Sequence, residues 1–348
     1  MGTHINGVVC HGKCFQKKSG HELGIADTAW QATRLSGIDS LEEQDEGRMK
    51  VALFSDVHGR LRIMLHLLQC WQMEHRTMLD AALLAGDVGC FPDVSRFDKA
   101  TRRWIERDPD EAGFPEYFMQ PRSEIEDVFQ GEPAHGEFSA VRCPVFMVAG
   151  NHEDFEFLNN CRNSGPAQGM PKHTFPVDCY GRIHCIENGQ IVRIEGQDGT
   201  SLRIAGLWGV EKAADHEPKK ISAKAATQLM GNGQGSFDLL VTHDAPNHSY
   251  LGHASSETIS VVLEMCRPPL HLFGHAHPVN GQHEFFTEHI PTHSWIFEDV
   301  CFGKQCTGNL ERAMGLLTWN SPEDHKIEMV TSPWLGSMRH RTWSHVWP

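Results

Sequence analysis

The sequence predicts a layered α/β (α+β) sandwich with mixed β-sheets. Two observations lead to this fold class: strand-like and helix-like stretches alternate from residue 50, and strands dominate the later part of the chain. The composition agrees with it, because 348 residues with 40% apolar and 22% charged side chains can bury a sizeable core.

Hydrophobic periodicity defines the individual elements. The apolar run Val51–Ser55 predicts a buried strand, and Arg60–Arg76 predicts a helix with Leu61, Leu65 and Leu68 on one face. The same reasoning predicts a helix at Glu153–Cys161 and strands at Ala81–Ala85, Val145–Ala149, Ile191–Ile194, Leu202–Leu207, Leu239–Thr242, His271–Phe273, Met314–Trp319 and Lys326–Val330.

We expect one domain at residues 49–335. Residues 1–48 show little periodicity and end in an acidic run, which predicts a flexible extension that need not belong to the native protein. Residues 108–140 carry four prolines among charged and aromatic side chains. They predict an irregular insertion that shapes substrate access or, alternatively, a packed surface excursion. Residues 336–348 are expected to form a C-terminal tail.

Charge and composition narrow the partners. The formal charge of −14, from 45 acidic and 31 basic residues, repels polyphosphate backbones and disfavours broad nucleic-acid binding. No apolar run approaches the ~20 residues of a membrane helix, and the start of the chain lacks the apolar core of a signal peptide. We therefore expect a cytoplasmic protein without a membrane partner. The 23 histidines favour the presence of a metal site, because histidine is the commonest metal ligand among side chains.

Five short polar motifs follow five of the predicted strands, at Phe54–Gly59, Ala85–Gly89, Ala149–Glu153, Val241–Asp244 and Phe273–His277. Ligands of α/β sheets bind beyond the carboxyl ends of the strands, so these motifs are expected to converge in one crevice. In a D-x-H or H-x-H pair on extended backbone, both side chains point to the same side. The neighbouring glycines allow close backbone approach.

The motifs contain seven side chains of metal-ligand type: Asp56, His58, Asp87, Asn151, His243, His275 and His277. Carboxylate, imidazole and amide donors without a thiolate suit Mn, Fe, Zn or Ni. Seven ligands exceed what one four-coordinate zinc needs and fit two ions that share a bridging carboxylate. Each motif alone has a structural alternative, such as a turn, a helix cap or a buried histidine, and the ordered set favours the metal site.

The ordered series DxH, GD, GNHE, HD and GHxH, over residues 50 to about 280, resembles the calcineurin-like metallophosphoesterases. The resemblance implies two mixed β-sheets flanked by helices and two divalent or mixed-valence metal ions, with Mn favoured. It implies that the first ion is held by Asp56, His58 and His277. It implies that the second is held by Asn151, His243 and His275, with Asp87 bridging the two ions.

The resemblance also implies how the chemistry is divided. A hydroxide shared by the two metals would be the nucleophile, because two cations lower the pKa of water. His152 would act as the general acid or stabilise charge on the phosphoryl oxygens. Glu153, or another nearby carboxylate, would orient that histidine.

Departures from the resemblance bear on the branch of the family. The serine/threonine phosphatase branch has an arginine shortly after its GD motif, whereas residues 86–91 read GDVGCF. Residues 150–153, 204–209 and 242–246 faintly resemble the RNA lariat debranching branch, but that branch usually has cysteine where this chain has Asp56. The sequence therefore assigns no RNA substrate.

We expect a hydrolase of phosphomonoesters or phosphodiesters, acting on a small-molecule phosphate ester. One alternative is a nuclease or RNA-processing phosphodiesterase, which the acidic charge disfavours. Another is a catalytically inactive scaffold of the same fold. Such a scaffold would be expected to have lost metal ligands, and the five motifs retain all seven candidates.

Overall fold

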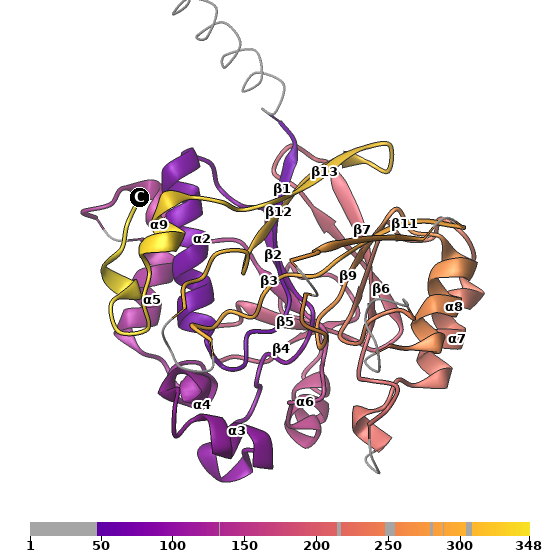
Figure 1. Ribbon diagram of the computed structural model, residues 1–348, viewed down its shortest axis with the longest axis horizontal. Helices are drawn as coiled ribbons and strands as arrows, with labels where there is room; N and C mark the ends of the chain where they lie inside the picture. Colours follow the sequence, from indigo (N-terminus) through magenta and orange to yellow (C-terminus); the bar gives the residue numbers. More distant parts are fainter. Residues whose placement is uncertain are drawn as a thin grey trace, which may run out of the picture. The chain divides into compact units, whose positions relative to one another are not determined.

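Figure 1 shows the computed structural model of the chain. The structure describes residues 47–131, 133–213, 217–247, 255–278, 281–287, 289–303 and 308–348. Of the predicted N-terminal extension at 1–48, residues 1–46 lie outside the described residues. Within the described ranges, no helix is both long and apolar enough to cross a membrane.

The first sheet has seven strands in the order β13-β12-β1-β2-β3-β5-β4. Its centre is parallel from β1 through β2 and β3 to β5, and β12, β13 and β4 add antiparallel pairs at the edges. Every residue of β1 is buried, as expected for a strand covered on both faces. The strands are β1 (Met49–Phe54), β2 (Ala81–Leu84), β3 (Val145–Met147), β4 (Thr174–Pro176), β5 (Ile183–Ile186), β12 (Gly315–Ser321) and β13 (Asp324–Met329).

The second sheet has six strands in the order β10-β11-β9-β8-β7-β6. It is also mixed, because β7, β8, β9 and β11 run parallel while β6 and β10 are antiparallel to their neighbours. The strands are β6 (Gln190–Glu195), β7 (Ser201–Leu207), β8 (Leu239–Thr242), β9 (Leu270–Leu272), β10 (Glu284–Thr287) and β11 (Ile290–Trp295).

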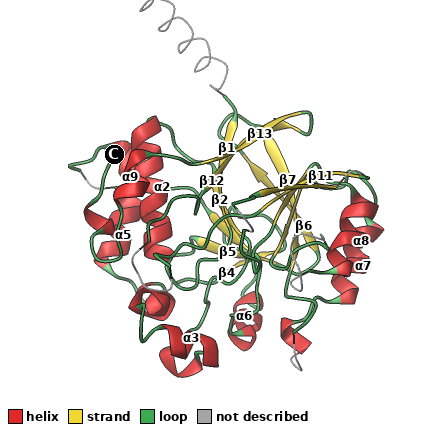
Figure 2. Ribbon diagram, viewed as in Figure 1, coloured by secondary structure: helices red, strands yellow, loops and turns green. Residues whose placement is uncertain are grey.

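Helices flank the two sheets. In Figure 2 the helices α2, α5 and α9 lie on one side and α7 and α8 on the other. The sheets themselves share one apolar core, in which Leu53 and Phe146 of the first sheet belong to the same cluster as Val241 and Leu272 of the second. The predicted sandwich of two mixed sheets flanked by helices is therefore confirmed.

The helices range from one to four turns. The longest is α2, which buries most of its residues and ends where Arg76 adopts a left-handed conformation and donates its N–H to the carbonyl of Gln72. The α-helices are α2 (Leu61–His75), α3 (Lys99–Trp104), α4 (Gly113–Tyr117), α5 (Ser123–Gln130), α6 (Phe155–Arg162), α7 (Ala223–Gly231), α8 (Glu257–Cys266) and α9 (Pro333–Ser337). Short 3-10 helices lie at Val94–Arg96, Pro109–Ala112, Glu137–Ser139, Glu217–Lys219 and Trp343–His345.

The structure adds detail to two segments of the expected domain organisation. Residues 108–140, expected to be irregular, contain α4, α5 and two 3-10 helices. Each of these helices is too short to show a clear period in the sequence. The expected tail at 336–348 packs against the domain, where the ring of Trp343 lies 5.4 Å from that of His66 on α2.

Candidate metal centre

A serine that joins the two sheets positions the first motif. The hydroxyl of Ser55, at the end of β1, donates to the carbonyl of Phe273 at 2.7 Å and accepts from the amide of Phe297 at 2.9 Å. The next residue, Asp56, is buried and accepts from the amide of His275 at 3.1 Å. The motif after β1 and the motif after β9 are thus held edge to edge, as the strand-end argument predicted.

Asp87 occupies the centre of the site. One carboxylate oxygen, Oδ1, accepts from the amides of Asn151 and His152, both at 2.7 Å. The other, Oδ2, lies 3.2 Å from Nε2 of His243. Asp87 is almost fully buried, and burial would raise its pKa, yet the charge of His243 holds that pKa well below its usual range. The carboxylate is therefore ionised and faces the crevice.

The ring of His243 reveals a site built for a cation. Its Nδ1 lies 2.9 Å from the carbonyl oxygen of Ala85, which only accepts, so Nδ1 carries the proton. The lone pair of Nε2 then faces Asp87 and the Oδ1 of Asn151, 3.1 Å away. In the neutral ring three acceptor atoms would therefore face one another, and in the absence of a metal ion a proton on Nε2 resolves this. Burial alone would lower the pKa of His243, but Asp87 and Asp56 outweigh it and raise the pKa to about 10.

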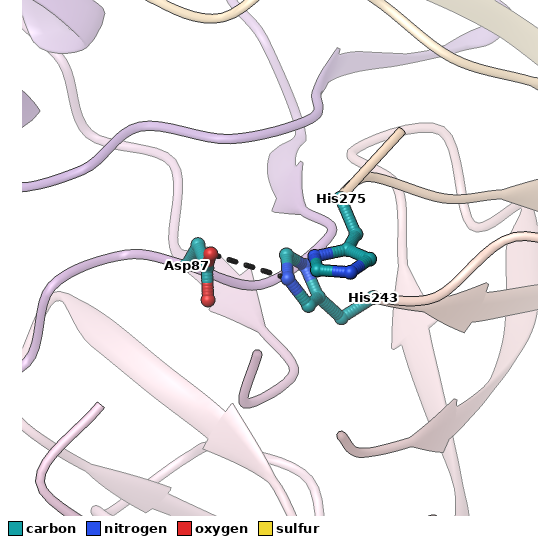
Figure 3. A group of neighbouring side chains, drawn as sticks. All are labelled: Asp87, His243 and His275. Carbon is teal, nitrogen blue, oxygen red and sulfur yellow. Dashed lines mark ion pairs between the residues drawn. The ribbon is translucent and has the colours of Figure 1, made fainter. Parts of the chain in front are cut away.

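Two groups of ligand atoms share Asp87. Asp87, His243 and His275 form one group, drawn in Figure 3, and Asp56, His58 and Asp87 form the other. Within each group one ligand atom per residue lies within 4.8 Å of the others. The donor types are carboxylate and imidazole, which suit divalent transition metals. These residues therefore fit the metal ions that the sequence implies.

Glycines hold this arrangement tightly. A Cβ at Gly150 would lie 2.2 Å from Oδ1 of Asp87, and one at Gly274 would lie 2.1 Å from Oδ1 of Asp56. At Gly86, which has a φ of +97°, a Cβ would lie 2.6 Å from Nδ1 of His243. In these three motifs the glycine is thus required by contact with a candidate ligand of another motif.

The remaining imidazoles suit metal binding at neutral pH. Burial lowers the pKa of His58 to about 3. Burial, together with the neighbouring charge of His243, lowers the pKa of His275 to about 4. Both rings are therefore neutral, which is the form that ligates a metal.

His277 lies apart from these two groups. Its side chain is 72% exposed, and its Nδ1 lies 3.8 Å from Oδ1 of Asp299. It still lines the same cavity as Asp56, Asp87 and His275. Five of the other sequence-predicted residues therefore gather around Asp87, and His277 lies at the rim. The ligand roles of all seven stay predictions.

The histidine predicted to be the general acid is held by a carboxylate outside the five motifs. Nδ1 of His152 lies 2.6 Å from Oδ2 of Asp98. Glu153 instead accepts from the backbone amides of Val88 and Cys90 at 2.8 and 2.7 Å. The sequence left open whether Glu153 or another nearby carboxylate contacts His152. In the structure that carboxylate is Asp98. Glu153 shapes the loop that carries Asp87.

A cavity of about 300 Å³ opens over these residues. It is lined by His152 and by five of the seven candidate ligands, and also by Trp104, Arg107 and Asp108. Sequence reasoning missed Asp98, Asp299, Trp104 and Arg107. None of them directly follows an apolar strand ending, so the pattern that found the other residues does not apply to them.

The fold is an α/β sandwich with Asp/His groups that could hold metal ions, and comparison with known proteins identifies its family. A family model described as calcineurin-like phosphoesterase matches residues 49–279, more than half of the chain. The chain therefore belongs to the calcineurin-like phosphoesterase family, as the ordered motifs predicted.

Two further comparisons do not refine the family assignment. Among solved structures, the protein TT1561 of Thermus thermophilus is similar at 14% sequence identity and a TM-score of 0.44, covering 82% of this chain and 100% of that one. No curated protein matches the chain. The family assignment rests on the family model and the motifs.

Proposed function

We propose that this protein hydrolyses a phosphomonoester or phosphodiester with the help of two divalent metal ions. One observation carries the proposal: the buried carboxylate of Asp87 belongs to both groups of ligand atoms. A shared carboxylate between two Asp/His groups is what a pair of neighbouring ions requires. Oxygen and imidazole nitrogen donors without a thiolate suit Mn, Fe, Zn or Ni, and the family resemblance favours Mn among them.

Different residues would hold the two metal ions. Asp56 and His58 would hold one ion, and Asn151, His243 and His275 the other, with Asp87 between them. His277 would complete the first set from the rim of the cavity. When bound, such ions supply a water-derived nucleophile at neutral pH and attract the phosphoryl oxygens.

His152 would protonate the leaving oxygen. Asp98 accepts from its Nδ1, so Nε2 is the nitrogen available to the substrate. Burial alone would lower the pKa of His152, but the hydrogen bond to Asp98 and the charge of Asp87 outweigh it and raise that pKa. The raised pKa favours the protonated ring, which is the form a general acid needs.

The test is hydrolysis by the full-length protein loaded with Mn²⁺, using p-nitrophenyl phosphate and bis-p-nitrophenyl phosphate as the two ester classes. We expect turnover of at least one ester and its loss after chelation. Asp87→Ala should lose metal and activity together, whereas His152→Ala should keep the metal and lose mainly rate. Absence of turnover with Mn, Fe, Zn and Ni would contradict the proposal and favour an inactive scaffold.

A further inference from the structure

The part of the cavity wall formed by α3 carries a feature that the hydrolysis of a phosphate ester does not itself require. Ala100, Thr101 and Trp104 of α3 line it, followed by Arg107. This wall belongs to the same cavity as Asp87 and His152. A ligand whose phosphoryl group lies at the Asp/His groups would therefore extend toward α3.

Trp104 and Arg107 lie in contact with each other on this wall. The guanidinium of Arg107 lies 5.4 Å from the centroid of the Trp104 ring, within the range of a cation–π contact. The amide of Arg107 donates to the carbonyl of Trp104 at 2.9 Å, which fixes the turn between them. An indole and a planar guanidinium both stack on aromatic rings, and the guanidinium also attracts anions.

Two carboxylates that line the cavity beside Arg107 are paired within the protein. Arg60 donates to Asp108 and to Glu111, both at 2.7 Å, and all three side chains are nearly buried. Arg60 offsets one of the two carboxylates, and burial raises the pKa of Glu111 to about 7, so the group carries at most one net negative charge. Trp104 and Arg107 line the cavity beside this group.

The size of the cavity limits the ligand. A volume of about 300 Å³ is at the lower end for small-molecule sites. The formal charge of −14 also disfavours a long polyanionic strand. A single nucleoside phosphate combines the required parts: a phosphate group, a compact sugar and a planar base that stacks on an indole.

We propose that the cavity binds a nucleoside phosphate, with the phosphoryl group at the Asp/His groups and the base against Trp104 and Arg107. This inference rests on the proposed function and specifies its substrate class. The reaction with a monophosphate consumes one water and releases nucleoside and phosphate. The phosphorus–oxygen bond to the sugar breaks, and the sugar oxygen takes up a proton.

The test compares binding of three probes to the Mn-loaded full-length protein by calorimetry: adenosine monophosphate, glycerol 3-phosphate and inorganic phosphate. Adenosine monophosphate should bind about tenfold more tightly than glycerol 3-phosphate, since base stacking is the difference between them. Trp104→Leu should remove most of this preference, and Trp104→Phe should retain part of it. Equal affinity for both esters in the wild type would overturn the inference.

A matched pair of arginines provides the control. Arg103 lies 5.5 Å from the same ring as Arg107, but only Arg107 lines the cavity. Arg107→Gln should weaken binding of adenosine monophosphate several-fold, and Arg103→Gln should not. Equal losses would mean that the arginines act by supporting the indole, and the proposed contact with the ligand would be wrong.

Binding and turnover separate the two proposals. Trp104-dependent binding of adenosine monophosphate without hydrolysis of any ester would sustain the nucleotide site and refute the proposed function. Hydrolysis of p-nitrophenyl esters without a preference for the nucleotide would sustain the proposed function and refute the nucleotide site. Tighter binding of a single-stranded oligonucleotide than of adenosine monophosphate would also refute the small-ligand inference.

Discussion

A methyl group added at Gly150 should disable the metal centre. The new Cβ would lie 2.2 Å from Oδ1 of Asp87, and contacts under 3.0 Å essentially do not occur, so the carboxylate or its backbone must move by about 0.8 Å. That oxygen accepts from the amides of Asn151 and His152, both at 2.7 Å, and the shift weakens both bonds. Overpacking and weakened hydrogen bonds together cost about 2–4 kcal/mol of folding free energy.

The effect on function should be larger than the effect on stability. A displacement near 1 Å at a catalytic group costs about 100-fold in rate. Metal content after dialysis, hydrolysis rate and urea unfolding measure the three consequences for Gly150→Ala. Gly231→Ala is the matched control, because nothing lies within 4 Å of its added Cβ at the end of α7, and its stability should be unchanged or slightly higher. Full metal content and activity in Gly150→Ala would refute the packing argument.

Three further substitutions test the surrounding contacts. Asp98→Asn should lower the pKa of His152, so the decline of kcat at high pH should begin at lower pH, with a loss of about tenfold or more in kcat; an unchanged pH profile would argue against the pair. Asp299→Asn should weaken the binding of one metal ion about 10-fold or more, because it removes the carboxylate next to His277. A metal titration should show this loss while the other ion is retained. Unaltered affinity for both ions would exclude this role. Glu153→Gln should destabilise the fold by about 1–3 kcal/mol in urea unfolding, because a carboxamide cannot accept from both amides; a loss of rate with full stability would instead support a catalytic role.

The predictable part of the structure follows from strand endings. Asp56 and His275 lie far apart in the sequence, yet each lies within three residues of the end of an apolar strand, β1 of the first sheet and β9 of the second. The amide of His275 meets the carboxylate of Asp56, in keeping with the expected convergence of the motifs in one crevice. The need for glycines in the motifs could also be predicted, but their contacts with ligands of other motifs could not.

The unpredicted part depends on how loops and short elements fold back. Asp98 precedes the six-residue helix α3, and its approach to His152 is set by tertiary packing rather than by any local pattern. β4 has only three residues, too few to show a period. α8 buries Ile259, Val262 and Cys266 at helical spacing, but its β-branched residues make the same run resemble a strand.

The central claim is that Asp87 lies between two bound metal ions. The most direct measurement is anomalous diffraction from crystals of the full-length protein grown with Mn²⁺. The account predicts two peaks about 3.5–4 Å apart, one on each side of Asp87, with His243 and His275 at one peak and Asp56 and His58 at the other. A single peak, or peaks that do not share Asp87, would contradict it.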